Sequence, residues 1–153
     1  MDDLTTTRRV LTEMAELLNA NGVNYSVFLR AYSGVMQDKT DISDIISGLI
    51  GEEVVIGGVQ DLGVTEVTEA LREYLGYPGD ESAGPDVSTL ESVEFSGLLN
   101  RLLESVAQLS ETSFGLKSFW FAEGHPAYPV FWDFAFLFLR KNEHCLLVGS
   151  SSD

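Results

Sequence analysis

Hydrophobic residues in the first two thirds of the chain recur at the spacing of helices. In residues 4–20 the apolar stripe follows the i, i+1, i+4, i+7, i+8 pattern, with the members Val10, Leu11, Met14, Leu17 and Leu18. The same period predicts four further helices, over residues 24–36, 41–50, 65–75 and 95–109. A glycine, which commonly ends a helix, follows three of the five, as Gly22, Gly51 and Gly76.

Two segments lack this period. Residues 52–63 are ambiguous, because the β-branched run at 54–56 followed by Gly57 and Gly58 suits a short strand or a helix end equally. Residues 76–88 are dense in Gly, Pro, Asp and Ser, which predicts a loop.

The last third changes to a strand-like pattern. It predicts strands at 117–122, 130–140 and 145–148, and consecutive strands with short links pair most simply as an antiparallel meander. Apart from Asp133, residues 130–139 are apolar on both faces, which predicts the central strand of the sheet. Helices would cover one of its faces, and a further helix, the tail or a partner subunit would cover the other.

These elements predict an α+β fold in which an N-terminal region of about five helices packs on a C-terminal three-stranded antiparallel meander. The 153 residues contain no repeat or low-complexity segment, so we expect a single domain over 1–153. A chain of this length buries roughly 70% of the surface that its unfolded form exposes, which is enough for one core.

Negative charge is concentrated in the middle of the chain. Residues 41–115 hold 15 Asp and Glu against only Arg72 and Arg101, whereas 1–40 and 116–153 are nearly neutral. This excess disfavours nucleic acid or an anionic membrane as partner, because both would be repelled over a Debye length of about 8–10 Å. Solubility alone also explains acidity, but its segregation favours a surface that meets a basic partner.

Cysteine content and hydropathy indicate the compartment. Cys145 is the sole cysteine, so the chain has no internal disulfide, and the residue fits a small buried hydrophobe. The neighbouring His144 would point to the opposite face of a strand, so the two do not form a catalytic dyad. No secretory signal precedes the first helix, and the longest apolar run, 134–139, is too short to span a bilayer. We therefore expect a cytoplasmic protein.

Motifs for cofactors and metals are absent from the sequence. Neither GxxxxGK[ST] nor GxGxxG occurs, so no phosphate-cradling loop is predicted. Asp38, Asp41 and Asp44 are spaced by three, unlike the alternating ligands of an EF-hand, and are more simply acids at a helix N-terminus. We expect no metal, no cofactor and no catalytic residue.

Polar groups beside the aromatic strand form an alternative ligand site. Glu123, His125 and Asp133 combine a potential general base with two carboxylates, and Trp132 could supply an aromatic wall. Structural roles explain the same residues: His125 can bond the backbone of its Pro-rich turn, and Trp132 can belong to the core. Asp133 must be paired, exposed or protonated, because burying it unpaired costs several kcal/mol. A small-molecule-binding protein or enzyme therefore stays as the alternative, and it requires these groups to converge on one pocket.

The acidic loop predicts the main function. Five carboxylates with no basic residue among them lie within 15 residues, namely Asp80, Glu81, Asp86, Glu91 and Glu94. Like charges so close together are tolerated when water solvates them. They also raise the rate of association with a partner whose surface is basic. In general character the chain is similar to bacterial immunity proteins, which are small, acidic and non-enzymatic. We therefore expect an inhibitor that occludes the active site of a basic toxin domain, and a homodimer that hides the apolar strand is left open.

Overall fold

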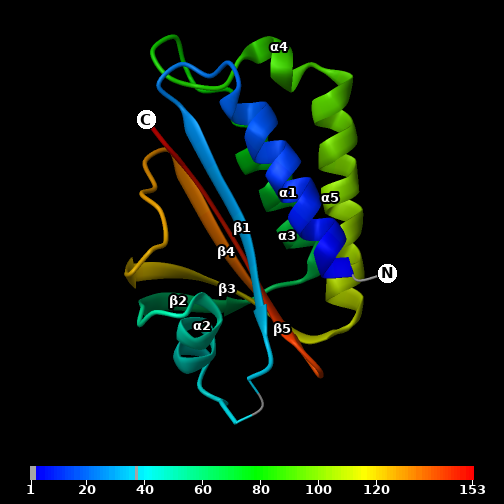
Figure 1. Cartoon of the computed structure of the whole chain (residues 1–153), viewed down its shortest axis with the longest axis vertical. Helices are drawn as coiled ribbons and strands as arrows, with labels where there is room; N and C mark the ends of the chain where they lie inside the picture. The colour runs from blue at the N-terminus through cyan, green and yellow to red at the C-terminus, as the bar shows by residue number, and fades with distance from the viewer. Residues whose placement is uncertain (1–2, 37) are drawn as a thin grey trace.

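The computed structural model describes residues 3–36 and 38–153, in which helices lie on both faces of one antiparallel sheet (Figure 1). The helices are α1 (Asp3–Asn19), α2 (Ile42–Ile50), α3 (Val64–Leu75), α4 (Val87–Leu90) and α5 (Val93–Glu111). The strands are β1 (Ser26–Gly34), β2 (Val55–Asp61), β3 (Ser113–Glu123), β4 (Trp132–Arg140) and β5 (His144–Ser152), in the order β1-β5-β4-β3-β2. Within the described ranges, none of the helices combines the length and the apolar content that crossing a membrane requires.

The predicted three-stranded meander is wrong, because the sheet has five strands. β3, β4 and β5 pair in succession, and β1 and β2 form the two edges. β1 lies within 24–36, where the spacing predicted a helix. Its Val27 and Ala31 belong to one core, whereas Phe28 and Tyr32 pack against the other. A strand that is apolar on both faces has no distinct period, and here its spacing imitated that of a helix.

The ambiguous segment 52–63 contains β2, the other strand that the prediction missed. Its pairing with β3 shifts register between Val55 and Ile56 and again between Gly57 and Gln60. Gly58 lies at the second shift and has a φ of 61°, a left-handed conformation that glycine adopts without strain. A seven-residue strand with a bulge in its middle is too short to establish an alternating pattern.

One face of the sheet is covered by three helices, α1, α3 and α5. Aromatic residues of β4 form much of the floor beneath them, and the ring centroids of Phe134 lie 6.0 Å from Trp132 and 5.2 Å from Phe136. The buried hydroxyls of Thr7 and Ser105 form a hydrogen bond between α1 and α5. Burial of this large apolar surface is the main source of stability, at about 25 cal/mol per Å².

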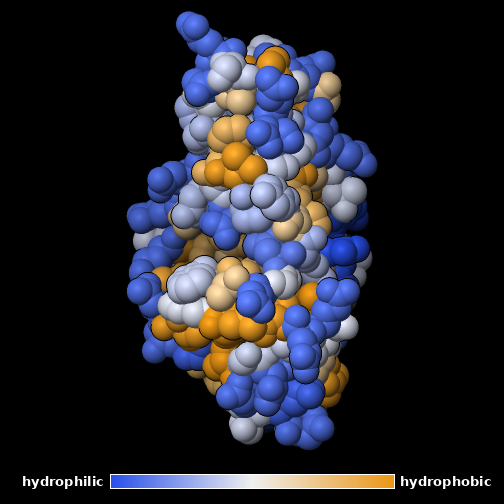
Figure 2. Space-filling view, turned by 90° about the vertical axis from the view of Figure 1, so that its left-hand side faces the viewer, coloured by the Kyte–Doolittle hydropathy of each residue, from blue (hydrophilic) through white to orange (hydrophobic). Residues whose placement is uncertain are grey.

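The other face is covered mainly by α2. Ile45, Ile46 and Leu49 of this helix form a second core with residues such as Leu137 of β4 and Leu146 of β5. β4 is the middle strand of the five, as its lack of a polar face predicted. Figure 2 looks onto this side and shows an apolar band at the height of α2, with a recess just above it. A single short helix therefore leaves part of this side open.

Candidate functional site

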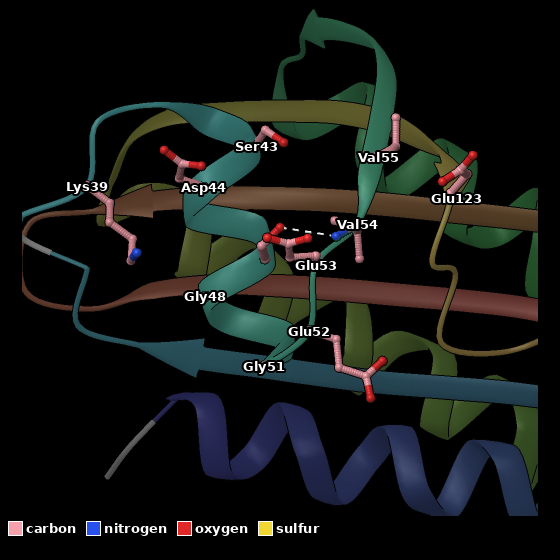
Figure 3. Close-up of a pocket in the computed structure, with 11 residues that line it drawn as sticks. Lys39, Ser43, Asp44, Gly48, Gly51, Glu52, Glu53, Val54, Val55 and Glu123 are labelled. Carbon is pink, nitrogen blue, oxygen red and sulfur yellow. Dashed lines mark hydrogen bonds between the residues drawn. The ribbon is translucent and has the colours of Figure 1, made fainter.

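A hollow of about 680 Å³ lies beside α2, between that helix and the start of β2 (Figure 3). We call it the α2 hollow, and the residues that line it are Lys39, Ser43, Asp44, Ser47, Gly48, Gly51, Glu52, Glu53, Val54, Val55 and Glu123. They come from the segment before α2, the helix itself, the turn that follows it and the end of β3. Two segments distant in sequence, residues 39–55 and the end of β3, therefore build the site.

The ends of α2 hold the hollow in shape. At the N-terminus, the carboxylate of Asp41 accepts a hydrogen bond from the amide of Asp44. At the C-terminus, Gly51 adopts the left-handed conformation at a φ of 88°, which turns the chain away from the helix. The hydroxyl of Ser47 then accepts a hydrogen bond of 3.2 Å from the amide of Val54, whose side chain is buried. The turn that carries the two glutamates is thereby tied to the helix.

The charge in the α2 hollow is strongly unbalanced. Its lining includes four carboxylates, those of Asp44, Glu52, Glu53 and Glu123, and one cation, Lys39. Lys39 lies on the opposite side of α2 from Glu52 and Glu123 in Figure 3. Among the described residues, ion pairs within 4.0 Å join only Glu13 to Arg101 and Asp61 to Lys117, both outside the hollow.

The helix dipole adds to this imbalance. Glu52 and Glu53 follow Gly51 at the C-terminal end of α2, where the peptide carbonyls leave a partial negative charge. A basic residue usually offsets that charge, but the last turn of α2 contains none. The hollow therefore attracts a cation more strongly than its carboxylates would alone.

The α2 hollow has the charge of a cation-binding surface. Its charged side chains are four carboxylates and one ammonium group, and no histidine or cysteine is among the described residues that line it. In the described part of the chain, no three His, Cys, Asp or Glu side chains converge closely enough for a metal ion. The carboxylates of the α2 hollow are therefore spread along its lining, and they match several separate cationic groups better than one metal ion.

The five carboxylates that the sequence singled out lie together at another end of the molecule. They occupy the loop between α3 and α4 and the junction of α4 with α5, at the top of Figure 1. We call this surface the acidic end, with the members Asp80, Glu81, Asp86, Glu91 and Glu94. All are exposed except Asp86, which is half-buried, and none forms an ion pair with a described residue.

The loop of the acidic end is held by hydrogen bonds. Asp80 Oδ1 accepts from the amides of Ser82 and Ala83 and from the Ser82 hydroxyl, at 2.8–3.0 Å. These bonds, led by the one from the hydroxyl, hold the pKa of Asp80 below its ordinary value. Val23 and Gly84 exchange two backbone hydrogen bonds of 2.9 Å, which fasten the loop to the segment before β1. Asp80 therefore orders the loop in addition to contributing charge.

The four residues of the alternative ligand site do not all lie together, although Asp133 is close enough to His125 to influence its pKa. Trp132 is buried under the three helices, where its indole N–H donates to the Tyr25 hydroxyl at 2.9 Å. Asp133 is exposed on the opposite face of β4, and Glu123 lines the α2 hollow. His125 Nδ1 accepts from the Ala127 amide at 2.9 Å, a bond within its own turn. Of these four residues, only Glu123 lines the α2 hollow.

His125 is nevertheless in an unusual environment. Burial lowers its pKa, and the nearby carboxylate of Asp133 acts in the opposite direction. The imidazole packs edge-on against Phe121, with the ring centroids 5.0 Å apart. His125 Nε2 is buried without a hydrogen-bond partner among the described residues, so no hydrogen bond at this atom offsets the cost of burying the cationic form.

The α2 hollow contains site residues that the sequence analysis missed, notably Glu52 and Glu53. Their position directly after a helix-ending glycine was visible in the sequence and marks acids at the negative end of a helix. Glu123 was selected, but as a partner of His125. By contrast, Cys145 is fully buried, which confirms its prediction as a small core residue.

No protein-family model matches this chain, and neither a curated protein nor a solved structure does. The physical character of its surfaces is therefore the basis for any functional proposal.

Proposed function

We propose that this chain is a non-enzymatic binding protein whose partner is a basic protein. The observation that carries the proposal is the acidic end, where five carboxylates form no ion pair with a described residue and three of them, Asp80, Glu81 and Asp86, lie on a fastened loop. A single-signed patch of this kind steers a cationic surface during diffusional encounter and raises its association rate.

Order in the acidic loop supports binding over simple solubility. A loop that serves only to keep a protein dissolved needs no fixed conformation, whereas Asp80 and the Val23–Gly84 pair hold this one in place. A surface that is ordered before binding loses less conformational entropy when a partner docks. The glutamates Glu81, Glu91 and Glu94 take no part in these bonds and are the residues best placed for contact.

The finer proposal is an inhibitor of the immunity-protein kind, acting in the cytoplasm. Its carboxylates would take the place of a phosphate backbone in the cleft of a basic nuclease toxin and thereby occlude the active site. The lack of a catalytic constellation in either acidic surface suits an inhibitor, which needs only shape and charge.

The test compares two triple charge reversals that change the net charge equally. The first, Glu81→Lys, Glu91→Lys and Glu94→Lys, inverts the acidic end without touching Asp80 or Asp86. The second, a control, reverses three exposed glutamates elsewhere on α3 and α5, namely Glu69→Lys, Glu104→Lys and Glu111→Lys.

Wild-type protein and both variants are immobilised and exposed to a lysate of cells that naturally contain the protein. We expect the wild type and the control to capture the same basic protein. For the purified partner, the acidic-end variant should associate at least about tenfold more slowly at low salt, with a weaker salt dependence. Equal association rates for the two variants, or capture of acidic proteins only, would overturn the proposal.

A further inference from the structure

The two edges of the sheet differ in how their outward backbone groups are bonded. Along β1, the side chain of Asn19 forms two bonds with Val27, accepting from its amide at 2.7 Å and donating to its carbonyl at 3.1 Å. Arg8 Nε donates to the carbonyl of Ala31 at 3.3 Å. Residues of α1 therefore bond backbone groups that an incoming strand would need, which guards an edge against unwanted pairing.

The β2 edge has no such guard. Within the described ranges, the backbone bonds of β2 are those to β3, and nothing bonds it from the outer side. Val55 and Val59 are 49% and 44% exposed, so the open edge carries exposed apolar residues. An unpaired edge with exposed β-branched residues is a template for an added strand.

A tryptophan lies against this edge. The indole of Trp120 packs on Gly57 and Gly58 so closely that a Cβ on either residue would come within 2.6 Å of it. Trp120 is nonetheless 54% exposed, so its outer part remains available next to β2. The bulge at Gly58 bends the strand and prevents a flat strand from pairing along its whole length. Pairing is thus confined to residues 55–57 at the start of β2, where β2 is continuous because the register shift between Val55 and Ile56 skips a residue of β3. This part of the strand adjoins the α2 hollow.

Charge decides between the occupants that this edge could take. A second copy pairing through β2 would bring two sets of Glu52, Glu53 and Glu123 close together, and like charges oppose that contact. A segment that carries Lys or Arg would instead place its cations among those carboxylates and at the negative end of α2.

We propose that β2 receives an extended basic segment of the partner as a sixth strand, with a Lys or Arg side chain in the α2 hollow. This inference rests on the proposed function, because it takes the partner to be a basic protein. It concerns a different surface from the acidic end, so the failure of one proposal can be distinguished from the failure of the other.

The probe is an acetylated and amidated octapeptide of sequence KVTVKVTV, titrated into the isotope-labelled full chain while amide NMR shifts are followed. We expect shifts confined to β2 and the lining of the α2 hollow. The same peptide with alternate amides methylated, which removes the donors of one edge, should not bind. Replacing both lysines by glutamate should also abolish binding.

Two variants separate the parts of the proposal. The triple variant Glu52→Gln, Glu53→Gln and Glu123→Gln removes charge from exposed positions and should weaken peptide binding about tenfold. The acidic-end variant Glu81→Lys, Glu91→Lys and Glu94→Lys should bind the peptide with unchanged shifts at β2.

Four outcomes would overturn the inference. They are no shifts at millimolar peptide, equal binding of the methylated peptide, shifts centred on the acidic end, and a dimer by analytical ultracentrifugation that buries β2. If the inference fails while the acidic end still captures a basic protein, the proposed function stands. If no basic protein is captured at all, the proposed function fails whatever the peptide does.

Discussion

The two faces of the sheet are covered by unequal amounts of structure. α1, α3 and α5 close one face over a large aromatic floor, whereas α2, a helix of nine residues, is the main cover of the other. Since β4 and β5 are apolar on both sides, neither face can be left bare. The difference suggests that the two faces have different roles. The three-helix face stabilises the fold, and the α2 face leaves the β2 edge and the α2 hollow available for contact with a partner.

The largest expected effect is on the three-helix face. Phe138→Ala removes a fully buried ring from the floor of that core, and we expect a loss of about 3–5 kcal/mol in the free energy of unfolding. Urea unfolding followed by circular dichroism measures it. Phe114→Ala is the matched control, because that ring is 73% exposed and its loss should change stability by about 0.5 kcal/mol or less. Similar losses for both would mean that this core is not the stabilising one.

A smaller effect is expected on the α2 face. Ile46→Ala removes a fully buried side chain, but α2 is short and can move into the space, so we expect about 2–3 kcal/mol. Native-state hydrogen exchange gives the sharper comparison. Amides of α2 should exchange through local openings of lower free energy than those of α5, which reports the global stability. Equal protection of the two helices from hydrogen exchange would show that both faces unfold as one unit. It would contradict the proposal that the two faces have different roles.

The helices of this fold were largely predictable, and the sheet edges were not. The stripes over residues 4–20, 41–50, 65–75 and 95–109 correspond to α1, α2, α3 and α5, because each helix has one apolar face and one wet face. β1 does not have one apolar and one solvent-exposed face, because its two faces pack against different cores. Only tertiary pairing with β5 distinguishes it from a helix, and no local spacing encodes that pairing.

The acidic surfaces were predictable in part for a similar reason. Asp80, Glu81 and Asp86 are neighbours in sequence, so their clustering needs no knowledge of the fold. The α2 hollow joins Glu52 and Glu123, which are 71 positions apart, and it exists only because β2 pairs with the end of β3. Because β2 itself was ambiguous, the site that depends on it could not be found from local patterns.

Acid pH should lower the stability of the α2 face more than that of the three-helix face. The effect should be smaller than that of either core substitution. Burial lowers the pKa of His125 and of His144, the former packed on Phe121 beside the α2 core. A lowered pKa means that the folded state binds the proton less well than the unfolded state. The stability that each histidine contributes is therefore complete above the ordinary value of about 6.5 and is lost as the pH falls through the lowered value.

The variant His125→Asn removes one of these titrations while keeping a side-chain acceptor for the Ala127 amide. Between pH 7.5 and 5 the wild type should lose more stability than this variant, and the double variant with His144→Asn should lose least. Because His125 adjoins the α2 core through Phe121, acid should also speed hydrogen exchange in α2 and β2 before it affects α5. Two results would contradict this prediction. They are an equal acceleration of hydrogen exchange on both faces of the sheet, and a pH profile of stability in His125→Asn that matches the wild type.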